Sequence, residues 1–138
     1  MIITRTPFRI SFAGGGTDLR AYYSKEPGKV ISSSITNYIY VVVKRQIGIV
    51  EHKYRINWSK VEFCNEIEEI EHPIVREALQ MFQIDFPIEI TTFTEIPGQT
   101  GLGSSSAFAV GLVHALYALK GEMVTKHTLA AKAAQIEV

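Results

Sequence analysis

The chain has 138 residues, of which 46% are hydrophobic, and its 14 basic and 14 acidic side chains balance to zero formal charge. This length fits one domain with a substantial core, and the neutral charge argues against a general nucleic-acid or membrane-surface partner. The single cysteine, Cys64, cannot form an intrachain disulfide, and no signal peptide or membrane-spanning stretch is visible, so we expect a cytoplasmic protein.

Alternating apolar residues and turn residues predict the elements of the first half of the chain. Pro7 separates two short strands, and the glycines 14–16 break the second of them. The segment 37–46 is apolar on both faces, as is typical of a central strand. The predicted strands are 2–4, 8–13, 29–35, 37–46 and 54–58, with a short helix at 18–24.

The second half is predicted to contain three helices and one strand. Pro73 suits the first position of a helix, and 87–93 alternates as a strand. The segment 104–120 is apolar almost all round, which indicates a buried helix. A last helix is expected after Thr125, which is a suitable N-cap residue. The chain ends at Val138 without the usual signals of a helix end, so we expect it to be cut inside or just after this helix.

The segment 96–107 combines a glycine-rich turn with three serines in front of the buried helix. Glycines let the backbone approach a ligand closely, and the first turn of a helix offers unpaired N–H groups to phosphate. It is not a Walker A loop, because Ser104 stands where the lysine belongs, and Ser106 replaces the third glycine of a dinucleotide-binding loop. The alternative is an ordinary loop in which Ser105 or a neighbouring serine only caps the helix.

Two motifs carry a resemblance to a known family. Pro97-x-x-x-Gly101-Leu102-Gly103-Ser104-Ser105-Ser106-Ala107 resembles the second signature of the GHMP kinases, the group of galactokinase and of homoserine, mevalonate and phosphomevalonate kinases. The string from Arg5 to Leu19 is similar to the opening of the branch that phosphorylates D-glycero-D-manno-heptose 7-phosphate. Two ordered motifs are more specific than either alone.

The resemblance implies a fold and an extent for the chain. The fold would be an α+β domain like the second domain of ribosomal protein S5, with left-handed βαβ connections. Residues 1–138 would form the N-terminal, ATP-binding domain, with the C-terminal domain absent and the catalytic aspartate beyond Val138. On its own, such a fragment would turn over poorly or not at all.

The resemblance also implies roles for the residues of the second motif, with ATP and Mg²⁺ as cofactors. Ser105 would ligate magnesium through its hydroxyl, and Glu137 would complete the magnesium shell, so these two residues are the predicted catalytic and metal positions. Phosphoryl transfer depends mainly on positioning and charge stabilisation, which suits this set. The predicted nucleotide-binding residues are Pro97, Gly98, Gly101, Leu102, Gly103, Ser104, Ser105, Ser106 and Ala107.

The first motif would bind the acceptor. Arg9 suits an anionic group on the substrate, because a guanidinium forms paired hydrogen bonds with phosphate. Arg5 is equally well explained as a solvated strand end, and Asp18 as a turn or helix cap. The predicted substrate-binding residues are Arg9, Gly14, Gly15, Gly16, Thr17 and Asp18.

We therefore expect an ATP-dependent sugar kinase whose partners are small-molecule sugars or sugar phosphates. The leading acceptor is the anomeric hydroxyl of D-glycero-D-manno-heptose 7-phosphate, and fucose or a hexuronic acid are alternatives. A non-catalytic nucleotide- or sugar-binding module and an RNA-associated protein of the same architecture are rival hypotheses from other classes. The neutral charge weighs against RNA. Oligomeric state is not readable from the sequence.

Overall fold

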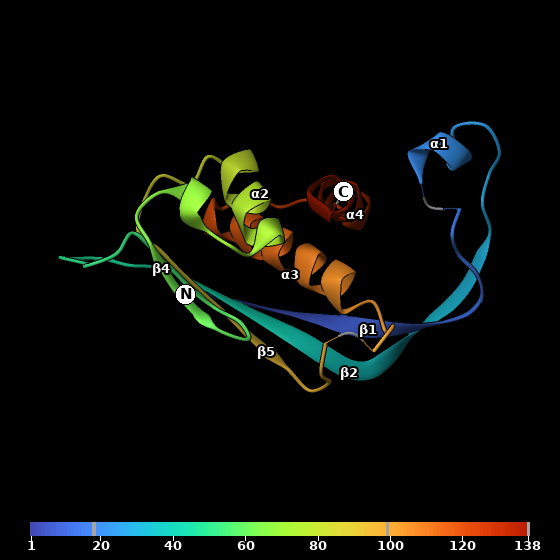
Figure 1. Cartoon of the computed structure of the whole chain (residues 1–138), viewed down its shortest axis with the longest axis horizontal. Coiled ribbons are helices and arrows are strands. Elements are labelled where there is room, and N and C mark those ends of the chain that lie inside the picture. Colours follow the sequence, from blue (N-terminus) through green and yellow to red (C-terminus); the bar gives the residue numbers. More distant parts are fainter. Residues whose placement is uncertain (18, 99, 138) are drawn as a thin grey trace.

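A computed structural model describes residues 1–17, 19–98 and 100–137. Within these ranges one mixed sheet is covered on one face by helices (Figure 1). The sheet runs in the order β1-β2-β5-β3-β4, in which β3 and β5 are parallel and the other neighbours are antiparallel. The strands are β1 (Ile2–Gly14), β2 (Val30–Arg45), β3 (Tyr54–Asn57), β4 (Val61–Cys64) and β5 (Ile88–Thr94). The α+β class expected from the sequence is confirmed.

The first two strands are long and form an arm that extends beyond the helical layer (Figure 1). The predicted interruptions, between 2–4 and 8–13 in β1 and between 29–35 and 37–46 in β2, were wrong. Pro7 does not break β1, because β1 is an edge strand, where a missing N–H is tolerated. The β1–β2 register shifts between Pro7 and Arg9 and again between Ser11 and Ala13. The connection at the end of the arm contains the short helix α1 (Arg20–Tyr23), close to the predicted place.

The parallel pair β3 and β5 is joined by a crossover containing β4, a short 3-10 helix η1 (Ile67–Glu69) and helix α2 (Pro73–Met81). Helix α2 begins at Pro73, as predicted, and buries Ile74, Val75, Ala78 and Leu79. Strand β4 was not predicted. Its side chains reverse the usual pattern, because Glu62 and Cys64 are buried while Val61 and Phe63 are exposed.

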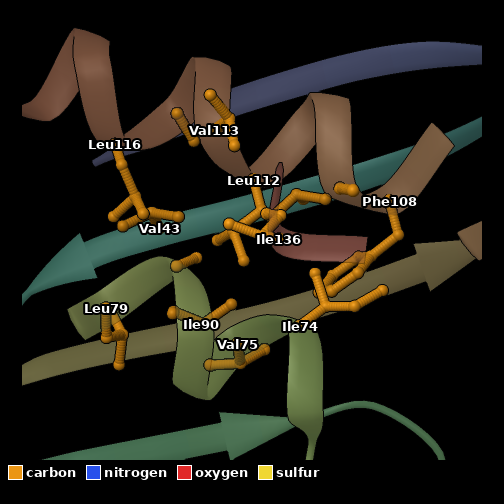
Figure 2. Packing of buried hydrophobic residues seen from close by; sticks show 14 of the residues in the cluster. Val43, Ile74, Val75, Leu79, Ile90, Phe108, Leu112, Val113, Leu116 and Ile136 are labelled. Carbon is orange, nitrogen blue, oxygen red and sulfur yellow. The ribbon is translucent and has the colours of Figure 1, made fainter. Parts of the chain in front are cut away.

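Helix α3 (Ser104–Leu119) lies across β1 and β2, and α4 (Lys126–Glu137) packs on α3. Figure 2 shows the core between these layers, where Val43 and Ile90 of the sheet meet Leu112 and Leu116 of α3. The Thr125 hydroxyl accepts a hydrogen bond from the Thr128 N–H at 3.1 Å, which confirms the predicted cap of α4. No helix in the described part of the chain is long and apolar enough to cross a membrane.

Helix α3 approaches the sheet closely at Gly111. The Thr4 hydroxyl of β1 donates a hydrogen bond to the Gly111 carbonyl at 2.8 Å. A methyl group on Gly111 would lie 3.0 Å from Oγ1 of Thr6 and 3.2 Å from Cγ2 of Val41, which is tighter than ordinary contact. This close approach holds the middle of α3 against the first half of β1 and the neighbouring β2.

Candidate functional site

The first turn of α3 is open to a ligand. Gly103 is the N-cap residue, with φ 73° and ψ 35°, and among the described residues no side chain caps the helix. Gly101 also has a positive φ of 73°. The interpretation of Ser104, Ser105 or Ser106 as the capping residue is therefore wrong, since the chain turns one residue earlier on a glycine. A helix of 16 residues then points the positive end of its dipole into this turn.

A cleft of about 590 Å³ begins at this helix terminus. One end is polar, with the hydroxyls of Ser104 and Ser105 and the backbone of Gly98. The rest of the wall is mostly apolar and aromatic. Its lining residues are Ile39, Trp58, Ser59, His72, Ile74, Thr92, Thr94, Ile96, Gly98, Ser104, Ser105 and Phe108. Apolar clefts with a few convergent polar groups are typical of small-molecule sites.

The aromatic wall was not predicted from the sequence. Trp58 is 37% exposed and lines the cleft, and Tyr22 and Tyr23 are also exposed. Tyr54, by contrast, is a fully buried core residue, and its hydroxyl donates to the Ile84 carbonyl at 2.9 Å. The sequence carries no signal that separates these exposed aromatic residues from the buried one.

His72 joins the aromatic wall to helix α2. Its ring lies 4.7 Å from the Trp58 ring and 4.9 Å from the Phe108 ring, and Nδ1 accepts from the Val75 N–H at 3.5 Å. Burial lowers the pKa of His72, and the negative charge of Glu62 opposes that shift. An Nδ1 that accepts a hydrogen bond carries no proton, so the bond and the lowered pKa both describe a neutral ring.

Glu137, at the end of α4, reaches the first turn of α3. The Ser106 hydroxyl donates a hydrogen bond to Oε1 of Glu137 at 2.9 Å. Of the two predicted metal ligands, Ser105 is exposed and lines the cleft, and Glu137 contacts the next residue, Ser106. A hydroxyl and one carboxylate fit Mg²⁺, which binds few protein oxygens and takes its other ligands from phosphate and water.

Arg9 adjoins the glycine loop from the sheet side. Its backbone N–H donates to the Leu102 carbonyl at 3.1 Å, and Nη1 donates to Oγ of Ser11 at 2.9 Å. A methyl group on Gly103 would lie 3.2 Å from Cγ and Nε of Arg9. The structure thus places a predicted acceptor-binding residue directly against the predicted phosphate loop.

A second cleft, of about 380 Å³, lies in the β1–β2 arm and is lined by Arg9. Of the predicted acceptor residues, Arg9, Gly15 and Thr17 line it, whereas Gly14 pairs with Val30 in the sheet and Gly16 does not line it. Asp18 lies outside the described residues. Lining residues that the sequence did not single out are Ser11, Tyr23, Gly28, Lys29, Val30 and Ser32.

The remaining predicted positions are distributed as follows. Leu102 contributes its carbonyl to the bond with Arg9, and Ala107 is buried in α3, where its N–H donates to the Gly103 carbonyl at 2.9 Å. Pro97 lies in the loop between β5 and α3. Arg5 lines neither cleft, and its guanidinium stacks 4.6 Å from the Tyr38 ring. The cation–π contact fits the alternative explanation of Arg5 as a surface residue.

Residues 73–138 match the family model described as GHMP kinases N terminal domain. The chain is 30% identical over 125 residues to D-glycero-alpha-D-manno-heptose 7-phosphate kinase of Campylobacter jejuni, a match covering 83% of this chain and 36% of that protein. The chain therefore spans about a third of the length of this curated relative.

Solved structures share the fold at lower identity. A D-glycero-D-manno-heptose 1-phosphate kinase from Bacteroides thetaiotaomicron superposes with a TM-score of 0.79 at 18% identity, covering 97% of this chain and 47% of that one. The phosphomevalonate kinase of Streptococcus pneumoniae, in complex with phosphomevalonate and AMPPNP, gives a TM-score of 0.73 at 20% identity, covering 99% and 42%. At these identities the likeness establishes the fold alone.

Proposed function

This chain belongs to the GHMP kinase family and carries its N-terminal domain, and from that premise we propose that its protein transfers the γ-phosphate of ATP to a sugar hydroxyl. We propose the anomeric hydroxyl of D-glycero-D-manno-heptose 7-phosphate as the acceptor. The 30% identity to a heptose 7-phosphate kinase supports this choice of substrate. Residues 1–138 would act as the ATP-binding domain.

The observation that carries the proposal is the contact of Arg9, which lines the second cleft, with the glycine loop that leads into the first cleft. The first cleft ends at the open helix terminus and the serines, which suits the phosphates of a nucleotide. Arg9 lines the second cleft, and its side chain lies against Gly103, the residue before Ser104 of the first cleft. Two substrates bound in these clefts would therefore lie on either side of this loop. Transfer of a phosphoryl group needs this arrangement, because catalysis here is chiefly positioning and charge stabilisation.

We assign the nucleotide to the first cleft. The backbone N–H groups of the first turn of α3 and the Ser104 hydroxyl would hold its phosphates, and the aromatic wall would accept its base. A carboxylate beside a triphosphate repels it unless a cation lies between them. The position of Glu137, one hydrogen bond from Ser106, therefore supports a magnesium ion held by Ser105 and Glu137. When bound, this ion would neutralise charge on the transferring group.

We assign the acceptor to the second cleft. Arg9 and Lys29 bring two positive charges to it, and no carboxylate is among its described lining residues. This balance favours an anionic sugar such as a sugar phosphate over a neutral one. Thr17, Ser11 and Ser32 supply hydroxyls for the sugar. The base that removes the acceptor proton is expected to be the aspartate beyond Val138.

The test is phosphorus NMR on the complete gene product that carries this chain, with magnesium, ATP and D-glycero-D-manno-heptose 7-phosphate. A new anomeric phosphate resonance, lost in Ser105→Ala and retained in Ser33→Ala, is the expected result; Ser33 is the control because it is an exposed serine that lines neither cleft. ATP consumption with another sugar alone would keep the kinase and replace the acceptor. Magnesium-dependent ATP binding without transfer to any sugar would favour the non-catalytic binding module instead.

A further inference from the structure

The aromatic wall of the first cleft is anchored from below by a buried carboxylate. Trp58 follows β3, and its backbone N–H donates to the Lys60 carbonyl at 3.0 Å, which turns the chain into β4. The indole Nε1–H donates to Oε1 of Glu62 at 2.6 Å. Glu62 is only 6% exposed, so its carboxylate lies beneath the cleft surface rather than in solvent.

Both oxygens of Glu62 are used as acceptors. Oε1 binds the indole, and Oε2 accepts the backbone N–H of Glu71 at 2.6 Å. Among the described residues, Glu62 takes part in no ion pair with a lysine or arginine. A buried carboxylate without its hydrogen bonds is costly, so the two N–H donors and the carboxylate hold one another in place. An indole has one polar atom, and this bond restricts its ring plane.

The anchored indole begins a row of rings that leads to the phosphate loop. The Trp58 and His72 rings meet edge to face, with an interplanar angle of 77°, and His72 then contacts Phe108. Phe108 lies four residues after Ser104 in α3, so it stands one helical turn above the polar end of the cleft. Glu62 therefore fixes the part of the wall that is farthest along the row from the serines.

We propose that Glu62 is a positioning residue that holds the Trp58 indole as the wall against which the base of the nucleotide lies. This inference rests on the assignment of ATP to the first cleft. Glu62 contacts no substrate itself and acts through Trp58. Its loss should weaken binding of a ligand that has a planar base and leave binding of the phosphate groups unchanged.

Glu62→Gln is the direct perturbation, because an amide offers one acceptor oxygen and one NH₂ donor and cannot accept from both Trp58 and Glu71. Glu68→Gln, which removes an exposed carboxylate on η1, is the matched control. Trp58→Phe is the second variant, because it keeps a ring in the wall but removes the donor to Glu62. Thermal melting of each variant establishes that it folds.

The experiment titrates the complete gene product that carries this chain with MgATP and, separately, with magnesium tripolyphosphate, which has no base. The indole N–H resonance that disappears in Trp58→Phe is that of Trp58, and it reports on the wall directly. We expect Glu62→Gln to shift that resonance, to weaken the binding of MgATP about tenfold and to leave the affinity for tripolyphosphate unchanged. Trp58→Phe should likewise weaken the binding of MgATP and leave the affinity for tripolyphosphate unchanged.

Each other outcome overturns one assignment. If Glu62→Gln binds MgATP as tightly as the unchanged chain, or loses both ligands equally, Glu62 does not position the base. The same holds if Trp58→Phe folds and keeps full MgATP affinity. If the unchanged chain binds MgATP no more tightly than tripolyphosphate, or binds neither, the assignment of the nucleotide to this cleft itself is wrong.

Discussion

Replacement of Gly103 by alanine tests the geometry of the loop before α3. The left-handed conformation of Gly103 costs a residue with a side chain about 1–2 kcal/mol. The added methyl would also lie 3.2 Å from Cγ and Nε of Arg9, so the guanidinium must move by a few tenths of an ångström. We expect Gly103→Ala to lower the free energy of unfolding by about 1–2 kcal/mol, and the melting temperature by about 4 °C per kcal/mol.

The same change should weaken MgATP binding about tenfold or more. A shifted loop misplaces the first-turn N–H groups assigned to the phosphates; a hydrogen bond to a charged group is worth about 1.5–3 kcal/mol, and tenfold in affinity corresponds to about 1.4 kcal/mol. Gly121→Ala is the control, because Gly121 has φ +75° and an added methyl there meets no described atom within 4 Å. Denaturant unfolding and calorimetric titration measure the two effects. If both variants lose similar stability and both keep full MgATP affinity, the conformation of the loop at Gly103 has no role in nucleotide binding.

Three further changes test separate parts of the structure. Lys29→Gln should raise KM for a sugar phosphate about tenfold and leave KM for the unphosphorylated sugar unchanged; an equal effect on both would remove Lys29 from phosphate recognition. Burial lowers the pKa of His72, so below a pH of about 6.5 the unfolded chain binds a proton there more readily than the folded chain does. The free energy of unfolding should therefore be highest above a pH of about 6.5 and fall as the pH drops toward the lowered pKa of the folded chain. His72→Asn can still accept the Val75 N–H but does not titrate, so it should flatten the pH dependence of the free energy of unfolding measured with denaturant. If the pH dependence is unchanged in this variant, another group causes it. Tyr54→Phe should cost about 1–3 kcal/mol by leaving the buried Ile84 carbonyl without its partner, whereas the exposed Tyr23→Phe should cost little.

The helices were predictable because local chemistry dominates there. Pro73 sets the start of α2, Thr125 caps α4, and the apolar segment from Ser104 forms a buried helix, all as expected. The strand boundaries in the arm were not predictable. Pro7 predicts a strand break when only local preference is considered. In the structure it lies in the edge strand β1, where the absence of an N–H donor is tolerated.

The cleft wall was hidden for a different reason. In β4 the apolar side chains Val61 and Phe63 face outward, and Glu62 faces the core. The alternation of apolar and polar residues predicts that a glutamate in such a strand faces solvent. Glu62 is buried because it accepts hydrogen bonds from Trp58 and from the Glu71 N–H, which lie in a turn and a loop. Propensity and periodicity describe single elements, so a polar contact between elements leaves no periodic signal.

The structure of α3 explains why a glycine, and not a serine, stands before this helix. A side-chain cap contributes about 1 kcal/mol to an ordinary helix, and here the described residues provide none. The helix does not depend on it, because Phe108, Leu112 and Leu116 are buried and Gly111 seats the helix on β1. Stability from burial leaves the N–H groups of the first turn available to a ligand. A cap at this position would occupy the donors that a phosphate needs, so the missing cap and the buried face together favour anion binding at this end.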